Sequence, residues 1–110
     1  MAKDKPDLLQ GTVDLIVLRI LNSGARHGYD IAKHIQLVSK DVITVGQGSL
    51  YPSLHRLESK GYIKAKWDIT ETGRRAKFYE LTKDGRQQAT TEESNWKELT
   101  RAVNLLLKHG

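Results

Sequence analysis

The spacing of apolar and polar residues predicts four helices and one β-hairpin along the chain. A first helix begins after Thr12, its expected N-cap, and ends at Ser23-Gly24. Apolar side chains cover most of its surface, and only Asp14 and Arg19 mark a side that faces solvent. A helix this apolar must lie at the centre of the core or be shared with a partner chain.

A second helix follows a short turn at residues 25–28. Ile31, Ile35 and Val38 recur at i, i+4 and i+7, which predicts a helix with one buried stripe. Residues 39–48 then form a connection that contains two glycines.

A third helix is predicted over residues 49–60. Leu50, Leu54 and Leu57 repeat the same spacing and fall within about 60° of one another around the helix axis. Pro52 is tolerated because it lies in the first predicted turn, where backbone N–H groups have no partner within the helix. The opposite side and its margins carry Tyr51, Pro52, Ser53, His55, Arg56, Ser59 and Lys60.

The segment after the third helix predicts a β-hairpin, or wing. Apolar and polar residues alternate over 62–69, residues 70–75 form a loop, and 76–81 form the return strand. Because an isolated hairpin is marginal in water, Trp67 and one face of the strand are expected to pack on the helices. The apolar face consists of Ile63, Ala65, Trp67 and Ile69.

The last helix is predicted from Thr82, its expected N-cap, to residue 108. A helix this long and one-sided cannot cover its apolar stripe against such a small domain, so we expect it to dimerise. Folding back within the chain is the alternative. The stripe has the spacing of a heptad seam and consists of Trp96, Leu99, Val103 and Leu106.

Three short helices, a hairpin and a long helix follow the plan of a winged helix-turn-helix protein. We therefore predict a mainly α fold with a small β-hairpin, in which a winged helix-turn-helix is joined to a long C-terminal dimerisation helix. Residues 1–81 form the DNA-binding part, with 1–7 flexible. Residues 82–110 form the dimerisation helix of the same compact unit.

Positive charge is concentrated in one part of the chain. The 110 residues carry a formal net charge of +5, and residues 55–77 alone hold seven lysines and arginines against three acids. Such a concentration is expected for a partner with a phosphate backbone. The alternative is that the lysines protect an edge hairpin from aggregation. The chain has no cysteine, no signal-peptide core and no apolar run that could span a membrane, so we expect it in the cytoplasm.

The third helix and the wing carry the candidate DNA contacts. A helix with a polar outer face fits the major groove, and arginines at a hairpin tip reach phosphates or the minor groove. Three candidates have alternatives: Arg56 as the partner of an acid, Tyr51 as a core aromatic, and Lys66 as a solubilising strand residue. The candidates are Ser49, Tyr51, Pro52, His55, Arg56, Lys60, Lys66, Arg74, Arg75 and Lys77.

Catalysis is not expected. The four histidines accompany no carboxylate cluster, and the chain has no glycine-rich phosphate loop, nucleophile elbow or metal signature. We therefore expect no enzyme, no cofactor and no metal site. A winged helix that binds another protein is the alternative to DNA binding, although such a module has no reason to keep a basic wing.

Three ordered segments resemble the PadR family of bacterial transcription regulators. They are His27–Ile31, Gly48–Gly61 and Gly73–Gly85, and the resemblance covers roughly residues 8–100. It implies a homodimeric winged-helix repressor on a pseudo-palindromic operator in double-stranded DNA. It also matches Tyr51 and the pair Arg74-Arg75 to DNA-contacting positions of the family.

The resemblance further implies how a dimer forms and what it senses. Family members pair through the C-terminal helix, which packs on the N-terminal helix of the other subunit, and many bind a small aromatic or toxic compound near that interface. Trp96 is thus a candidate for ligand binding, with packing in the dimer seam as its alternative. The candidate dimer residues are Leu9, Val13, Leu99, Val103 and Leu106.

Overall fold

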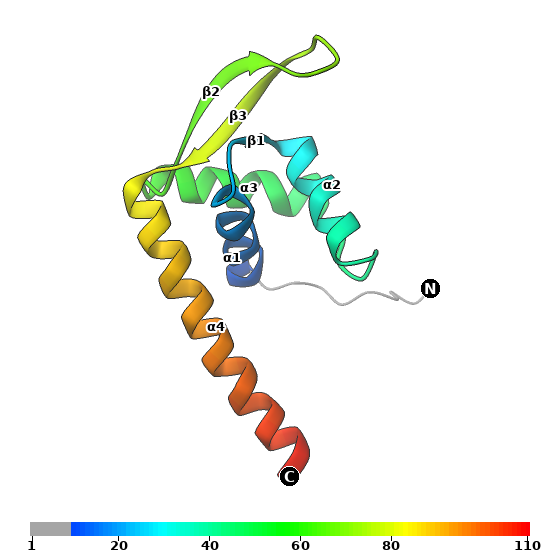
Figure 1. Cartoon of the computed structure of the whole chain (residues 1–110), viewed down its shortest axis with the longest axis vertical. Coiled ribbons are helices and arrows are strands. Elements are labelled where there is room, and N and C mark those ends of the chain that lie inside the picture. Colours follow the sequence, from blue (N-terminus) through cyan, green and yellow to red (C-terminus); the bar gives the residue numbers. More distant parts are fainter. Residues whose placement is uncertain (1–9) are drawn as a thin grey trace.

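The computed structural model describes residues 10–110, which form four helices and a three-stranded sheet (Figure 1). The elements are α1 (Gln10–Leu21), β1 (Arg26–His27), α2 (Gly28–Val38), α3 (Gln47–Ser59), β2 (Ile63–Ile69), β3 (Arg75–Leu81) and α4 (Lys83–His109). Their order confirms the predicted fold, with β2 and β3 as the wing. Leu9 and residues 1–7, for which we made predictions, lie outside the described residues.

Two predicted helix starts are wrong. Thr12 lies inside α1 rather than capping it, because the helix already includes Gln10. α3 begins at Gln47, two residues earlier than predicted, so Pro52 lies in the second turn. There it removes the hydrogen bond that the carbonyl of Gly48 would accept. Both residues are exposed, so water can satisfy this carbonyl.

A short strand, β1, extends the wing into an antiparallel sheet of order β1-β3-β2. Arg26 pairs with Tyr79 and His27 with Phe78. We predicted only a turn at this place, because a two-residue strand is too short to show a period. By pairing with β3, strand β1 connects the start of α2 to the wing.

The core lies between the first three helices and the base of the wing. Two placements in our predictions are wrong. Val38, in the last turn of α2, is 66% exposed rather than buried. Val13, a candidate dimer residue, is only 3% exposed and packs in the core, so it offers no surface to a second chain. The largest fully buried apolar side chains are Val17, Leu18, Leu21, Ile31, Leu50, Leu54 and Ile63.

Only the base of the wing packs on the helices. Ile63 and Tyr79 are buried, whereas Trp67 is 57% exposed and Ile69 is 59% exposed. The prediction that Trp67 packs on the helices is therefore wrong. Towards its tip the hairpin lies above the start of α2, as Figure 1 shows, and a groove lined by both elements separates them, so the outer half does not pack closely on a helix.

The long helix α4 leaves the domain after a tightly fixed start (Figure 1). Thr82 is its N-cap, as predicted, and its side-chain oxygen accepts a hydrogen bond from the Gly85 N–H at 3.0 Å. The backbone N–H of Thr82 donates to the carbonyl of Tyr62, also at 3.0 Å. Residues 101–110 are all exposed, so α4 does not fold back on the domain. No helix within residues 10–110 is both long and apolar enough to cross a membrane.

Candidate nucleic-acid interface

Helix α3 turns its leucines inward and a polar face outward. Leu50, Leu54 and Leu57 are each about 2% exposed or less, which confirms the predicted stripe. A helix divided in this way can present its outer side chains to the major groove. The exposed candidates on it are Ser49, Tyr51, Pro52, His55 and Lys60.

Tyr51 lies at the margin of this face and covers the start of α2. Its side chain is 43% exposed, yet a Cβ placed on Gly28 would come within 2.5 Å of its hydroxyl oxygen. Gly28 therefore leaves room for Tyr51, and any side chain at this position would displace the ring. Residue spacing alone contains no signal for this role of Gly28.

Arg56 points into the protein, which corrects its predicted place on the exposed face. Its Nη2 donates to Asp14 Oδ1 at 2.8 Å and its Nε donates to Asp14 Oδ2 at 3.4 Å. The hydroxyl of buried Ser53 donates to the same Asp14 Oδ1 at 2.5 Å. The Asp14 side chain, predicted to face solvent, is only 16% exposed. Of the two roles considered for Arg56, the structure shows the pairing with an acid. This ion pair connects α3 to α1.

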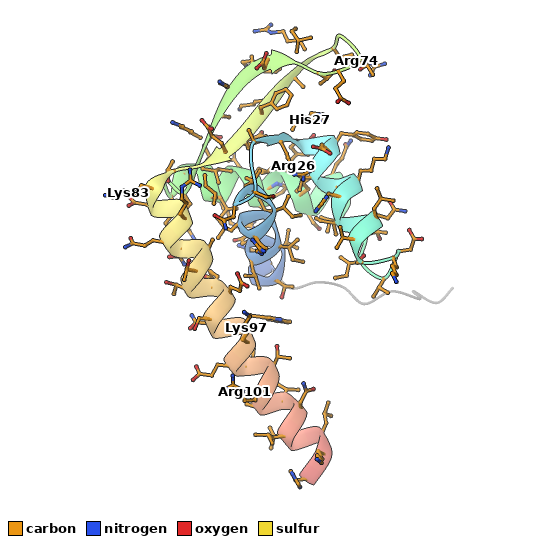
Figure 2. The ribbon with its side chains drawn as sticks, viewed as in Figure 1. Arg26, His27, Arg74, Lys83, Lys97 and Arg101 are labelled. Carbon is orange, nitrogen blue, oxygen red and sulfur yellow. The ribbon has the colours of Figure 1, made fainter. Side chains whose placement is uncertain are left out.

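The tip of the wing carries Arg74 above the start of α2, as Figure 2 shows. The tip is closed by a hydrogen bond of 2.7 Å from the Thr70 N–H to the Arg74 carbonyl. A groove of about 960 Å³ separates the tip from α2, and Lys33, Arg74 and Arg75 line it. Lys33 was not among our candidates, because nothing in its helix distinguishes it from a solvated lysine. Asp30 and Glu71 line the groove as well, and Asp30 is paired with Arg26 at 3.2 Å. The exposed arginines at the tip, Arg74 and Arg75, are the lining groups best suited to a phosphate.

Two cations of β3, Arg75 and Lys77, lie over aromatic rings. The guanidinium carbon of Arg75 lies 4.7 Å from the centre of the Trp67 ring. The Lys77 Nζ lies 5.9 Å from the centre of the Tyr79 ring. On β2, Lys66 is exposed. The wing therefore presents charges that are partly held in place by its own aromatic residues.

Tyr79 connects the base of the wing with α3. Burial raises the pKa of its hydroxyl above the usual value near 10, and the α3 residues Glu58 and Tyr51 raise the same pKa further. The Tyr79 ring lies in the same buried cluster as Leu54 and Leu57 of α3, on the side of the sheet that faces this helix.

A second concave surface lies between α1, α2 and α4. It encloses about 550 Å³, and its polar lining includes His34 and Glu93. Trp96 of α4 lines it and is 45% exposed. Its apolar lining residues include Leu15, Ile16, Ile20, Ile35 and Val38.

The chain resembles known transcriptional regulators over most of its length. “Transcriptional regulator Rv3488” of Mycobacterium tuberculosis is 34% identical over 86 residues, which cover 78% of this chain and 79% of that protein. The solved structure of a transcriptional regulator from Clostridium thermocellum is 30% identical and has a TM-score of 0.80. That similarity covers 90% of this chain and 96% of the other.

A third relative is described as a member of a named family. The crystal structure of a PadR family transcription regulator from hypervirulent Clostridium difficile is 29% identical, has a TM-score of 0.73 and covers 86% of this chain and 97% of the other. The family model described as “Transcriptional regulator PadR-like family” matches residues 17–91, which include α2, α3 and the whole wing. The chain therefore belongs to the PadR-like family, whose members are DNA-binding transcriptional regulators and not enzymes.

Proposed function

We propose that two copies of this chain pair through α4 and that the dimer represses transcription by binding a pseudo-palindromic operator. The observation that carries this proposal is the apolar stripe that α4 leaves exposed. In this proposal, residues 82–110 serve dimerisation and residues 1–81 serve DNA binding.

The exposed stripe continues the face by which α4 packs on its own domain. Ala89, near the start of the helix, is buried, and Val103 lies on nearly the same side, about four turns later. Leu99, Val103 and Leu106 are 57%, 43% and 67% exposed. Fully burying one such side chain contributes about 1.5–3 kcal/mol. A second chain that covers this face would therefore stabilise the pair substantially.

In the proposed complex, each subunit places α3 in a major groove and its wing on the adjacent backbone. Dimer symmetry then requires two half-sites about one helical turn apart. Arg56 is left out of the proposed contacts because it is paired with Asp14. The proposed contacts are Ser49, Tyr51, Pro52, His55 and Lys60 from α3, and Lys66, Arg74, Arg75 and Lys77 from the wing.

We also propose that a small aromatic effector binds in the concave surface beside Trp96. The apolar lining and the half-exposed indole fit a flat, apolar ligand. Because this surface joins α4 to α1 and α2, a ligand there can alter the angle between the two α3 helices of a dimer. An affinity change equivalent to about 1–3 kcal/mol is typical of such coupling.

Three measurements test the proposal, the first two on the purified protein. Analytical ultracentrifugation should give twice the mass of one chain. Selection from genomic DNA fragments, repeated at two salt concentrations, should enrich one palindromic motif, with affinity falling as salt rises. A reporter gene placed behind that motif should be repressed. A monomer, or salt-insensitive binding to a protein partner in place of DNA, would contradict the proposal.

A further inference from the structure

Trp67 is a large apolar side chain on the outer half of the wing, which does not pack closely on a helix. More than half of it is exposed, and the contact recorded for its ring is with the guanidinium of Arg75 at 4.7 Å. An exposed tryptophan loses the benefit of burial, so a contact with a cation is a physical reason for its presence here.

The strand register places this pair on one side of the wing. Trp67 lies opposite Lys77, and Ile69 lies opposite Arg75. Side chains two residues apart on a strand share a face, so Arg75, Lys77 and Tyr79 of β3 point the same way. Tyr79 faces α3. The Trp67–Arg75 pair therefore lies on the face of the wing that is turned to the side of α3, further out along the hairpin.

We propose that Trp67 is a positioning residue of the DNA interface, which holds the guanidinium of Arg75 ready for a backbone phosphate. A guanidinium stacked on an indole keeps its N–H donors free, because they lie in its own plane and point away from the ring. Stacking also removes much of the freedom that a long side chain would lose on binding DNA. This inference rests on the proposed function, in which the wing contacts DNA.

Arg74 serves as the internal control for Arg75. It is the neighbouring residue, it is exposed, and it lines the same groove at the tip. Among the described residues no aromatic ring contact is recorded for Arg74, whereas Arg75 has one. Loss of Trp67 should therefore affect the contribution of Arg75 to binding and leave that of Arg74 unchanged.

The test is a pair of double-mutant cycles, Trp67→Ala with Arg75→Ala and Trp67→Ala with Arg74→Ala. The probes are the duplex selected above and a mixed-sequence duplex, since a phosphate contact serves both. Trp67→Ala alone should weaken binding about two- to fivefold, the range expected for an exposed cation–π pair. This loss should vanish in the Arg75→Ala background and persist in the Arg74→Ala background.

Two controls separate positioning from a structural role. Trp67→Phe retains a ring and should recover most of the affinity. Leu37→Ala, at an exposed apolar residue of α2 outside the proposed contacts, should leave binding unchanged. Thermal unfolding of each variant shows whether the wing remains folded.

Two outcomes would overturn the inference alone: no loss of affinity in Trp67→Ala, or an equal loss in both arginine backgrounds. An equal loss would mean that the indole itself contacts DNA or merely supports the hairpin. If Arg74→Ala and Arg75→Ala both bind DNA like the wild type, the proposed DNA contact of the wing fails, and the inference fails with it.

Discussion

Gly85 is the residue at which α4 meets the base of the wing. A Cβ at this position would overlap the carbonyl oxygen of Tyr62 and would lie 3.2 Å from Leu81 Cδ2. The overlapped atom belongs to the backbone, so it cannot turn aside as a flexible side chain would. We expect Gly85→Ala to lower the free energy of unfolding by at least about 2 kcal/mol, although alanine is ordinarily about 1 kcal/mol better than glycine in a helix. Chemical denaturation followed by circular dichroism measures this change.

Gly48→Ala is the matched control for Gly85→Ala. Gly48 also lies in the first turn of a helix, but open space surrounds the position of its Cβ. This substitution should leave the free energy of unfolding unchanged or raise it by up to about 1 kcal/mol, because alanine favours a helix more than glycine does. If both substitutions had the same small effect, close contact with Tyr62 would not be what fixes α4 against the wing.

Asp14 is the residue that fastens α1 to α3. Its carboxylate accepts hydrogen bonds from Arg56 and from Ser53, which is 0% exposed. Asp14→Ala leaves both donors without an acceptor, so we expect the free energy of unfolding to fall by about 1–3 kcal/mol, measured by chemical denaturation. Glu80→Ala removes an exposed 3.6 Å pair with Lys64 and should have an effect below about 1 kcal/mol. Similar losses for the two variants would contradict the structural role of Asp14.

At the scale of elements, the wing should contribute affinity that does not depend on sequence. We expect the double substitution Arg74→Ala and Arg75→Ala to weaken binding to every duplex and to reduce the slope of log affinity against log salt by about one to two, because each phosphate contact contributes about 0.9. Fluorescence anisotropy at several salt concentrations measures this slope. The control is Arg101→Ala with Lys108→Ala, which removes the same charge from the exposed part of α4 (Figure 2). An equal loss of slope in both variants would indicate only a general effect of net charge.

The elements themselves were largely predictable, because local periodicity determines them. The leucine stripe of α3 and the N-cap of α4 can both be recognised from residues that lie seven positions apart or fewer. The sequence could not indicate which part of an element is covered by its neighbours in the fold. The alternating pattern of β2 continues through Trp67 to Ile69, but whether that face is covered depends on how far the helices extend. Asp14 and Arg56 lie 42 positions apart, so no local pattern reveals their contact.

At the scale of the whole molecule, the shape itself favours a second chain. The described residues extend 53 × 38 × 21 Å, and α4, with 27 residues, runs about 40 Å. It carries its apolar stripe away from the domain into solvent (Figure 1). A single recognition helix also reads only one half-site, whereas two held at a fixed separation can require both half-sites at the correct spacing.

The stripe can be tested by placing a charge on either side of the same helix. We expect Val103→Lys to abolish the dimer and to lower operator affinity steeply, because burying an uncompensated lysine opposes association. The rest of the domain should keep its fold, since Val103 is 43% exposed and is not a member of the buried core. Leu105→Lys is the control, because Leu105 is 54% exposed and lies about 200° around the helix from Val103. Ultracentrifugation and operator binding should therefore separate the two variants, and a Val103→Lys protein that remained dimeric would show that the subunits pair through another surface.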